Sequence, residues 1–235
     1  KKILITGANG QLGHEMRNAL KGNNRFECIF TDVAELDICN TEAVKQTMAN
    51  NHIDYIVNCA AYTQVDKAED NAELCKKINT DAVENLARAA ADYGARMIHI
   101  STDYVFNGRG YRPYTEDMVP DPQSVYGSTK LEGEKILTDI CPESIIIRTA
   151  WLYSPYGNNF VKTMLHLGEE REELSVVADQ IGTPTCAADL AQAILVILQA
   201  DTFVPGTYHF SDEGVCSWYD FTVTIHRLAG ITTCR

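Results

Sequence analysis

The sequence predicts an α/β protein built on a doubly wound parallel sheet, and two observations lead to this fold class. Over residues 1–150, short apolar and largely β-branched runs alternate with longer stretches of helical periodicity. The apolar runs are continuous rather than alternating, as expected for strands that are covered by helices on both faces. Right-handed crossovers between such strands then fix most of the topology.

The elements of the first 150 residues can be placed one by one. Helices are expected from about Gln11, from Thr41, over a stretch that ends near Tyr93, and across the segment VYGSTKLEGEKIL. Strands are expected at Ile3–Thr6, Phe26–Thr31, Tyr55–Cys59, Met97–Ser101 and Ile145–Thr149.

The rhythm loosens after Thr149, which predicts a second and smaller unit. We therefore divide the chain into a sheet domain, residues 1–150, and a smaller C-terminal lobe, residues 151–235, which is interleaved with the sheet. We expect the lobe to be truncated at its C-terminal end, because the sequence stops soon after a helix. The lobe is predicted to contain helices at Asn159–Arg171, Ala187–Ala200 and from Ser217, with strands at Leu174–Ala178 and near Tyr208.

Charge and hydropathy exclude several classes of partner. The 235 residues carry 20 Lys plus Arg against 32 Asp plus Glu, a formal net charge of -12. Such an acidic chain does not favour binding to a nucleic acid or to a membrane surface. No apolar run approaches the roughly 20 residues of a spanning helix, and no signal peptide precedes the first strand, so we expect a cytoplasmic protein. The eight cysteines lack CxxC spacing and are expected to be reduced packing residues.

A glycine-rich loop follows the first predicted strand and opens the first helix. Glycines at this place permit a tight turn and let backbone N–H groups approach a pyrophosphate at the positive end of the helix. The context of strand, loop and helix is what makes the motif informative, because the glycine pattern alone is common in turns. We predict a dinucleotide site that includes Gly7, Asn9, Gly10, Gln11, Leu12 and Gly13.

Two acidic positions near the end of the second strand are candidates for the adenosine end of that dinucleotide. Asp32 ends the strand, where a carboxylate accepts hydrogen bonds from ribose hydroxyls; the alternative is a solvated strand-end carboxylate. Asp37 and Ile38 lie where the chain turns back toward the expected adenine. For Asp37, a role in starting a turn or capping the next helix is a nearly equal alternative.

Tyr126 and Lys130 are the predicted catalytic pair. They are four residues apart on a helical pattern and therefore face the same way. The spacing alone is a weak signal, but the pair follows the strand that ends in Ser-Thr-Asp at the carboxyl edge of the sheet, where this fold class binds ligands. A neighbouring ammonium lowers the pKa of a phenol and makes it a usable proton relay. Thr102 would hold the substrate oxygen, and Lys130 would also bind the hydroxyls of the nicotinamide ribose.

Together these motifs resemble the extended short-chain dehydrogenases/reductases. Within them, the chain is most similar to the dTDP-4-dehydrorhamnose reductase family, from Lys2 to about Ala229. The strings that carry the resemblance occur in the order and at spacings like those of the family: STDYVFNG, PYTEDMVPDPQSVYGSTKLEGE, IRTAWLYSPYGNNFVKTML and DQIGTPTCAADLA.

The resemblance implies reduction, with NADPH or NADH, of the 4-keto group of a dTDP-4-dehydro-6-deoxy-L-hexose, which gives dTDP-L-rhamnose. It implies that Tyr126 donates the proton and that Trp151 packs on the sugar, although Trp151 is also compatible with ordinary core packing. Asn158 and Asn159 open a helix that could receive the pyrophosphate of the substrate, with simple N-capping as the alternative. The resemblance adds Asp103 to the substrate site and Ala61, Tyr62 and Thr63 to the cofactor site.

The sequence departs from the family at its metal site. Family members can hold magnesium between subunits through glutamates; Glu15 matches one of them, but Ala188 stands where a second would be. We therefore predict no metal, while a homodimer stays open. The six histidines show no ligand spacing, and we expect structural roles for all of them, His99 included.

Two other functions remain compatible with the sequence. One is a non-catalytic cofactor-binding regulatory subunit, like that of methionine adenosyltransferase, which the intact set of Thr102, Tyr126 and Lys130 argues against. The other is a nucleotide-sugar epimerase or 4,6-dehydratase, but dehydratases place an Asp-Glu pair after the threonine, and here Asp103 and Tyr104 follow it. The choice between NADH and NADPH stays open as well.

Overall fold

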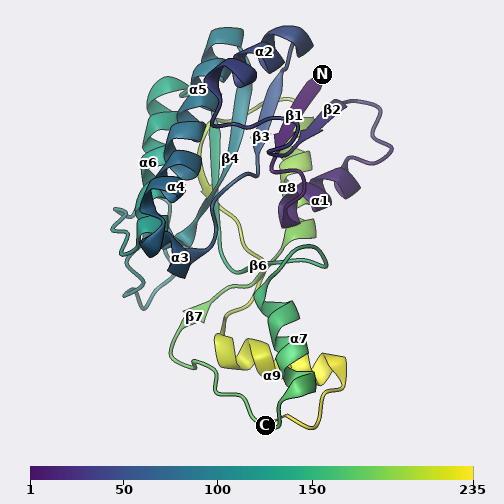
Figure 1. Ribbon diagram of the computed structural model, residues 1–235, viewed down its shortest axis with the longest axis vertical. Helices are drawn as coiled ribbons and strands as arrows, with labels where there is room; N and C mark the ends of the chain where they lie inside the picture. Colours follow the sequence, from purple (N-terminus) through teal and green to yellow (C-terminus); the bar gives the residue numbers. More distant parts are fainter. Residues whose placement is uncertain (235) are drawn as a thin grey trace.

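The computed structural model describes residues 1–234 and contains one large parallel sheet (Figure 1). Its six strands lie in the order β2-β1-β3-β4-β5-β9, and each neighbouring pair is parallel. The predicted doubly wound fold is thus confirmed. The strands of this sheet are β1 (Lys2–Thr6), β2 (Glu27–Thr31), β3 (Tyr55–Asn58), β4 (Arg96–Thr102), β5 (Ile145–Thr149) and β9 (Gly206–His209).

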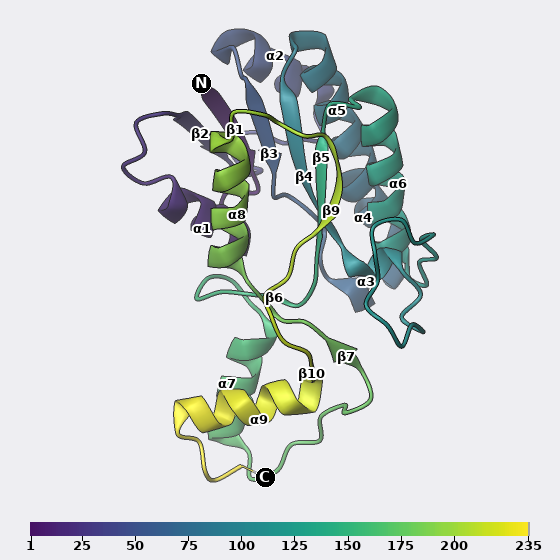
Figure 2. The ribbon, with the colours of Figure 1, turned by 180° about the vertical axis from the view of Figure 1, so that it is seen from behind.

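Helices cover both faces of the sheet, which explains the continuous apolar runs (Figures 1 and 2). Ile3 and Ile5 pack toward α1 and α8, whereas Leu4 between them packs toward α2, α5 and α6. The helices around the sheet are α1 (Gln11–Ala19), α2 (Thr41–Asn51), α3 (Val65–Asp70), α4 (Ala72–Lys76), α5 (Ala82–Tyr93), α6 (Val125–Ile140) and α8 (Ala187–Gln199), with a π-helical turn η1 (Lys77–Asp81) and a 3₁₀ turn η2 (Asp103–Val105).

A smaller lobe lies beyond the carboxyl ends of the strands (Figure 2). Its two helices, α7 and α9, pack against each other. The helix α9 begins with a capping box, in which the Ser217 hydroxyl accepts from Asp220 N–H and the Asp220 carboxylate accepts from Ser217 N–H. The lobe and its connections contain α7 (Phe160–Glu170), α9 (Trp218–Ala229), β6 (Leu152–Tyr153), β7 (Ile181–Gly182), β8 (Thr185–Cys186) and β10 (Cys216–Ser217).

The chain passes between lobe and sheet more than once. After α7 and β7, it returns to the sheet layer as α8 and then as β9, which pairs with β5. It leaves again for β10 and α9. The interleaving expected from the sequence is therefore observed.

The predicted strand at 174–178 is wrong, because this segment forms neither strand nor helix. Its apolar residues lack a partner strand, and most of its side chains are exposed, so β propensity is not supported by packing. Val177 accepts a single hydrogen bond, from Tyr219 N–H at 3.0 Å. The strand forms a few residues later instead, where β7 pairs antiparallel with β10.

Two general expectations can be compared with the described residues, 1–234. No helix among them has the length and the apolar character that are needed to cross a bilayer. The cysteines at 28, 39, 59, 75, 141, 186 and 216 are thiols; Cys75 and Cys141 are buried, and the other five are half-buried.

Candidate active site and cofactor cleft

The glycine loop lies between β1 and α1, at the point where the sheet order reverses direction. Gly7 has a φ of +63°, and a Cβ there would approach Ala60 N to 2.6 Å. A Cβ on Gly13 would overlap the backbone of Gly7 and Ala8. Gly10 is the N-cap of α1 and makes no side-chain cap, which leaves the first-turn N–H groups of the helix suited to an anion.

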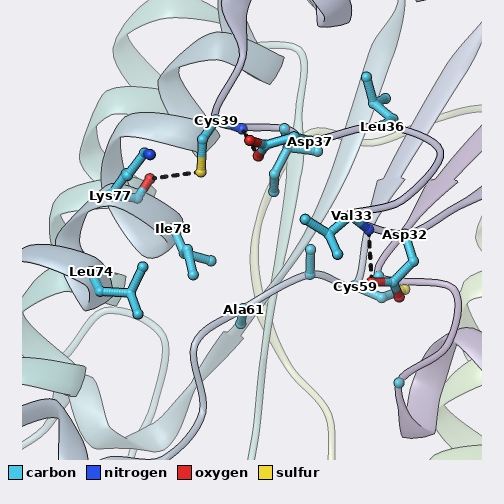
Figure 3. Close-up of a pocket in the computed structure, with 14 residues that line it drawn as sticks. Asp32, Val33, Leu36, Asp37, Cys39, Cys59, Ala61, Leu74, Lys77 and Ile78 are labelled. Carbon is cyan, nitrogen blue, oxygen red and sulfur yellow. Dashed lines mark hydrogen bonds between the residues drawn. The ribbon is translucent and has the colours of Figure 1, made fainter. Parts of the chain in front are cut away.

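A cleft of about 400 Å³ runs from this loop across the ends of β2 and β3 (Figure 3). Of the predicted cofactor residues, Gly7, Gly10, Asp32, Asp37, Ile38 and Ala61 line it. The other lining residues were not predicted: Val33, Leu36, Cys39, Cys59, Ala60, Leu74, Lys77 and Ile78.

Asp32 ties the glycine loop to the end of β2. Its carboxylate accepts from Asn9 N–H at 2.9 Å and from Val33 N–H at 2.8 Å. The carboxylate also borders the cleft, so it is placed where a ribose could meet it (Figure 3). Asp32 is therefore not a fully solvated strand-end carboxylate, because it accepts two backbone hydrogen bonds.

The turn after β2 brings Asp37 and Ile38 to the other side of the cleft. Asp37 accepts from Cys39 N–H at 2.9 Å, and its carbonyl accepts from Asn40 N–H, so it makes the turn that the sequence left as an alternative. Ile38 is buried. The helix α2 takes its cap from Asn40, whose side chain accepts from Ala43 N–H, and not from Asp37.

The segment after β3 is held by Asn79, a residue that no sequence motif indicates. Asn79, buried in η1, accepts from Tyr62 N–H at 2.8 Å and donates to Tyr62 C=O at 3.1 Å. Tyr62 packs against the small apolar cluster that includes Tyr126. Ala61 lines the cleft, whereas Thr63 is exposed and outside its lining.

Tyr126 and Lys130 lie on α6 as predicted, and both are nearly inaccessible, at 8% and 1% exposed. Ser124 caps the helix by accepting from Gly127 N–H at 3.0 Å. The helix lies so close to the 3₁₀ turn η2 that a Cβ on Gly127 would overlap Tyr104 C=O. Tight packing therefore holds the pair at the carboxyl end of β4.

Thr102 is the last residue of β4, and its side chain faces the predicted proton donor. Burial raises the pKa of Tyr126 well above its usual range, although a hydrogen bond between Tyr126 and Thr102 acts in the opposite direction. Thr102 Oγ1 also donates to Asp103 Oδ1 at 3.2 Å. Burial raises the pKa of Asp103 to about 6.

The side-chain nitrogen of Lys130 is held by residues of β4. Nζ donates to Ile100 C=O at 2.6 Å and lies 3.3 Å from His99 Nε2. Burial lowers the pKa of Lys130 to about 8, although Glu134 and Cys75 act in the opposite direction. His99 thus touches the predicted catalytic lysine, a contact that sequence spacing does not reveal.

Trp151 lies in an aromatic cluster of the lobe that also contains Tyr153, Phe160, Trp218 and Phe221. It has a positive φ of 49°, and its indole stacks on Trp218 with ring centroids 3.4 Å apart. The structure therefore gives Trp151 the packing role that the sequence left open, and contact with a sugar stays a prediction.

Asn159 is the N-cap of α7, accepting from Lys162 N–H at 3.1 Å. Its amide donates to Gln11 Oε1 at 2.9 Å and to Ser154 C=O at 2.8 Å. The capping alternative is therefore observed, and Gln11 connects the glycine-loop helix with the lobe. Asn158 is exposed beside it.

The residues at the family's metal site are also visible. Glu15 is 8% exposed on α1 and accepts from Asn18 Nδ2 at 3.1 Å, while Ala188 lies on α8. Within residues 1–234, no group of three or more His, Cys, Asp or Glu side chains is arranged to hold a metal.

Comparison with known proteins places this geometry in one family. Residues 1–234 match the model of the RmlD substrate binding domain. A dTDP-4-dehydrorhamnose reductase of Escherichia coli K12 is 46% identical over 240 residues, which cover 97% of this chain and 79% of that protein.

Two solved structures agree with this assignment. A dTDP-4-dehydrorhamnose reductase from Clostridium acetobutylicum superposes with a TM-score of 0.96 at 50% identity, covering 100% of this chain and 83% of that one. One from Bacillus anthracis, in complex with NADP, gives 0.94 at 42% identity, with 99% and 82% covered. The shared sequence, fold and site show that this chain belongs to the family of the RmlD substrate binding domain.

Proposed function

We propose that this protein is a dTDP-4-dehydrorhamnose reductase, which uses NADPH or NADH to reduce the 4-keto group of dTDP-4-dehydro-6-deoxy-L-mannose to dTDP-L-rhamnose. One observation supports this most directly: Tyr126, Lys130 and Thr102 lie together at the carboxyl end of β4, in a chain whose relatives carry that activity.

The lining of the cleft suits the adenosine and pyrophosphate part of a nicotinamide dinucleotide. A Cβ at Gly7 would overlap the backbone of Ala60, so only glycine permits this turn, and the uncapped start of α1 suits a pyrophosphate. When bound, the reduced nicotinamide supplies the hydride that the carbonyl carbon requires. Asp32 would hold the adenosine ribose, Asp37 and Ile38 the adenine end, and Lys130 the nicotinamide ribose.

The chain's own residues supply the proton. Because burial raises the pKa of Tyr126, its hydroxyl is protonated at neutral pH and can donate to the carbonyl oxygen. Thr102 donates a hydrogen bond that orients that oxygen, and a protonated Lys130 stabilises the phenolate that remains. Burial of this pair strengthens each of these interactions, because water does not screen them.

We assign the substrate contacts beyond the reacting carbonyl to Asp103, Trp151, Asn158 and Asn159, near or in the lobe. On this assignment residues 1–150 bind the cofactor and contribute Asp103 to the substrate, residues 151–235 supply the other sugar-nucleotide contacts, and α8 and β9 complete the sheet. The edge of Trp151 and the first turn of α7 would face the sugar and the diphosphate.

We further propose that the enzyme works in the cytoplasm, as a possible homodimer, without a metal and without a nucleic-acid or membrane partner. Thiols at seven described cysteine positions suit a reducing compartment. The net charge of -12 disfavours polyanionic partners.

The test is NADPH oxidation in the presence of the dTDP-4-keto sugar, with the product identified by mass spectrometry and NMR. Formation of dTDP-L-rhamnose with one NADPH consumed per sugar supports the proposal. Tightly copurified NAD and a product without net reduction would indicate an epimerase or dehydratase. Cofactor binding without turnover would indicate a regulatory subunit.

A further inference from the structure

A row of buried polar side chains crosses the sheet beneath the cofactor cleft and ends at Lys130. Thr6, Asn58 and His99 are register partners on β1, β3 and β4. These three residues and Lys130 are each at most 1% exposed. Polar groups this deep must satisfy one another, so their donors and acceptors can be assigned in sequence.

The assignment of donors and acceptors begins at the backbone N–H of Ala60, which can only donate. Ala60 N–H lies 3.2 Å from Asn58 Oδ1, and Thr6 Oγ1 donates to the same oxygen at 2.7 Å. This fixes which end of the Asn58 amide is the oxygen. Its Nδ2 then faces His99 Nδ1 at 3.0 Å, so Nδ1 must accept.

The proton of a neutral His99 therefore sits on Nε2. Burial, and then the charge of Lys130, hold the pKa of His99 well below its usual value, so the ring is neutral. Nε2 lies 3.3 Å from Lys130 Nζ. An imidazole N–H can donate to a neutral amine, whereas an ammonium has no lone pair to accept it.

We propose that Asn58 and His99 are positioning residues that direct an N–H at Lys130 and thereby oppose its protonation in the cofactor-free protein. The amine can still donate to Ile100 C=O, at 2.6 Å. Protonation of Lys130 leaves the Nε2–H of His99 without an acceptor, unless the proton of His99 moves to Nδ1 or the amide of Asn58 turns. The side chain is thus a switchable acid–base group rather than a fixed charge.

The other groups that face Lys130 act in the opposite sense. Glu134, on the same helix, and Cys75, on α4, both raise the pKa of Lys130. Glu134 is bound to Arg148 of β5, and no hydrogen bond joins Glu134 or Cys75 to Nζ among the described contacts. His99 is therefore the titratable group in hydrogen-bond contact with Nζ.

The first test needs no variant and no turnover. On cofactor-free protein labelled with ¹⁵N, the ring nitrogens of His99 are assigned by comparison with His99→Gln, and Lys130 is titrated through its side-chain signals. We expect a protonated Nε2, an unprotonated Nδ1 and a Lys130 midpoint at or below about pH 8. A proton on Nδ1 at neutral pH would overturn the proposal.

The second test reverses the direction of the hydrogen bonds that His99 makes with residue 58 and with Lys130. Asn58→Asp removes the N–H that faces His99, so Nδ1 should gain the proton and Nε2 should accept from Lys130. The Lys130 midpoint should rise by about one unit or more. Because the new carboxylate also adds charge, Asn58→Leu serves as the uncharged companion and should shift the tautomer and the midpoint in the same direction.

Two controls separate this role from a purely structural one. Asn24→Asp adds the same charge on an exposed loop and should leave the midpoint unchanged. His99→Gln keeps an acceptor toward Asn58 and a donor toward Lys130, so it should preserve the low midpoint. If the tautomer stays on Nε2 in both Asn58 variants, the directing role is wrong; should both fail to fold, the wild-type spectrum decides alone.

A kinetic measurement links this inference to the proposed function. It is the only one of these tests that depends on the proposed function. The alkaline fall of kcat/KM should move to higher pH in Asn58→Asp, in step with the midpoint measured by NMR. A protein without reductase activity would remove this arm but leave the tautomer result standing. A profile that stays fixed while the midpoint moves would show that Lys130 does not control turnover.

Discussion

Glu134 and Arg148 form a two-point ion pair between α6 and the sheet, with Arg148 Nη2 2.7 Å from Glu134 Oε2 and Nε 3.0 Å from Oε1. Their side chains are 4% and 7% exposed. Since Glu134 lies one helical turn beyond Lys130, the pair fastens the proposed catalytic helix to β5.

Breaking this pair should cost much more than breaking an exposed one. Glu134→Gln leaves a buried guanidinium without its counter-ion, and we expect a loss of about 3–5 kcal/mol in the free energy of unfolding. The matched control is Glu84→Gln, whose exposed pair with Arg88 should contribute about 0.5 kcal/mol. Urea denaturation measures both, and equal losses would contradict the assignment.

Tyr126→Phe keeps the ring and removes the donor. We expect turnover to fall at least about a hundredfold, with NADPH affinity near that of the wild type. Tyr111→Phe, at a 90% exposed position, should change neither. Steady-state kinetics and fluorescence titration of NADPH provide the comparison, and an active Tyr126→Phe enzyme would rule out Tyr126 as the donor.

The pH profile should report Lys130. Burial lowers its pKa to about 8, and the ammonium is the form that stabilises the phenolate. Below this value Lys130 is protonated and kcat/KM should be level; above it, kcat/KM should fall about tenfold per pH unit. Lys130→Met should abolish this limb and also weaken cofactor binding. If cofactor affinity were unchanged, the proposed contact with the ribose would be wrong.

Asp32 is expected to influence the choice of cofactor. Its carboxylate repels a 2′-phosphate and favours a 2′-hydroxyl, so Asp32→Ala should shift the preference toward NADPH severalfold without abolishing binding of either cofactor. Because Asp32 also accepts from Asn9 N–H, the alanine variant should bind both cofactors more weakly. Asp32→Asn, which can retain one acceptor, separates the two effects in competition titrations. An unchanged ratio would leave cofactor choice to the Asp37–Ile38 turn.

The sheet was predictable because each of its strands shows as a continuous apolar run in its own short stretch of sequence. Ile3, Leu4 and Ile5 are all apolar because helices cover both faces, and this pattern requires no knowledge of the partners. The two-residue strands of the lobe were not predictable, since each exists only through a distant partner, as Ile181 does through Ser217.

The same limit applies to the site. The chemistry of Tyr126 and Lys130 could be predicted from spacing and position, whereas the contact between His99 and Lys130 is set by the packing of α6 on β4. The stacking of Trp151 on Trp218 joins two residues far apart in sequence. Nothing in the local pattern around Asn79 indicates that it holds the backbone of Tyr62.

The return of α8 and β9 to the sheet has a consequence for biosynthesis. Until the ribosome has made α8, the apolar side of β1 lacks the cover that Leu190 and Ile194 provide, and until it has made β9, the nascent sheet ends at an open β5 edge. Closure of these layers therefore waits for segments that come after the first lobe helix, so the two parts should acquire their final packing together, in one late cooperative step.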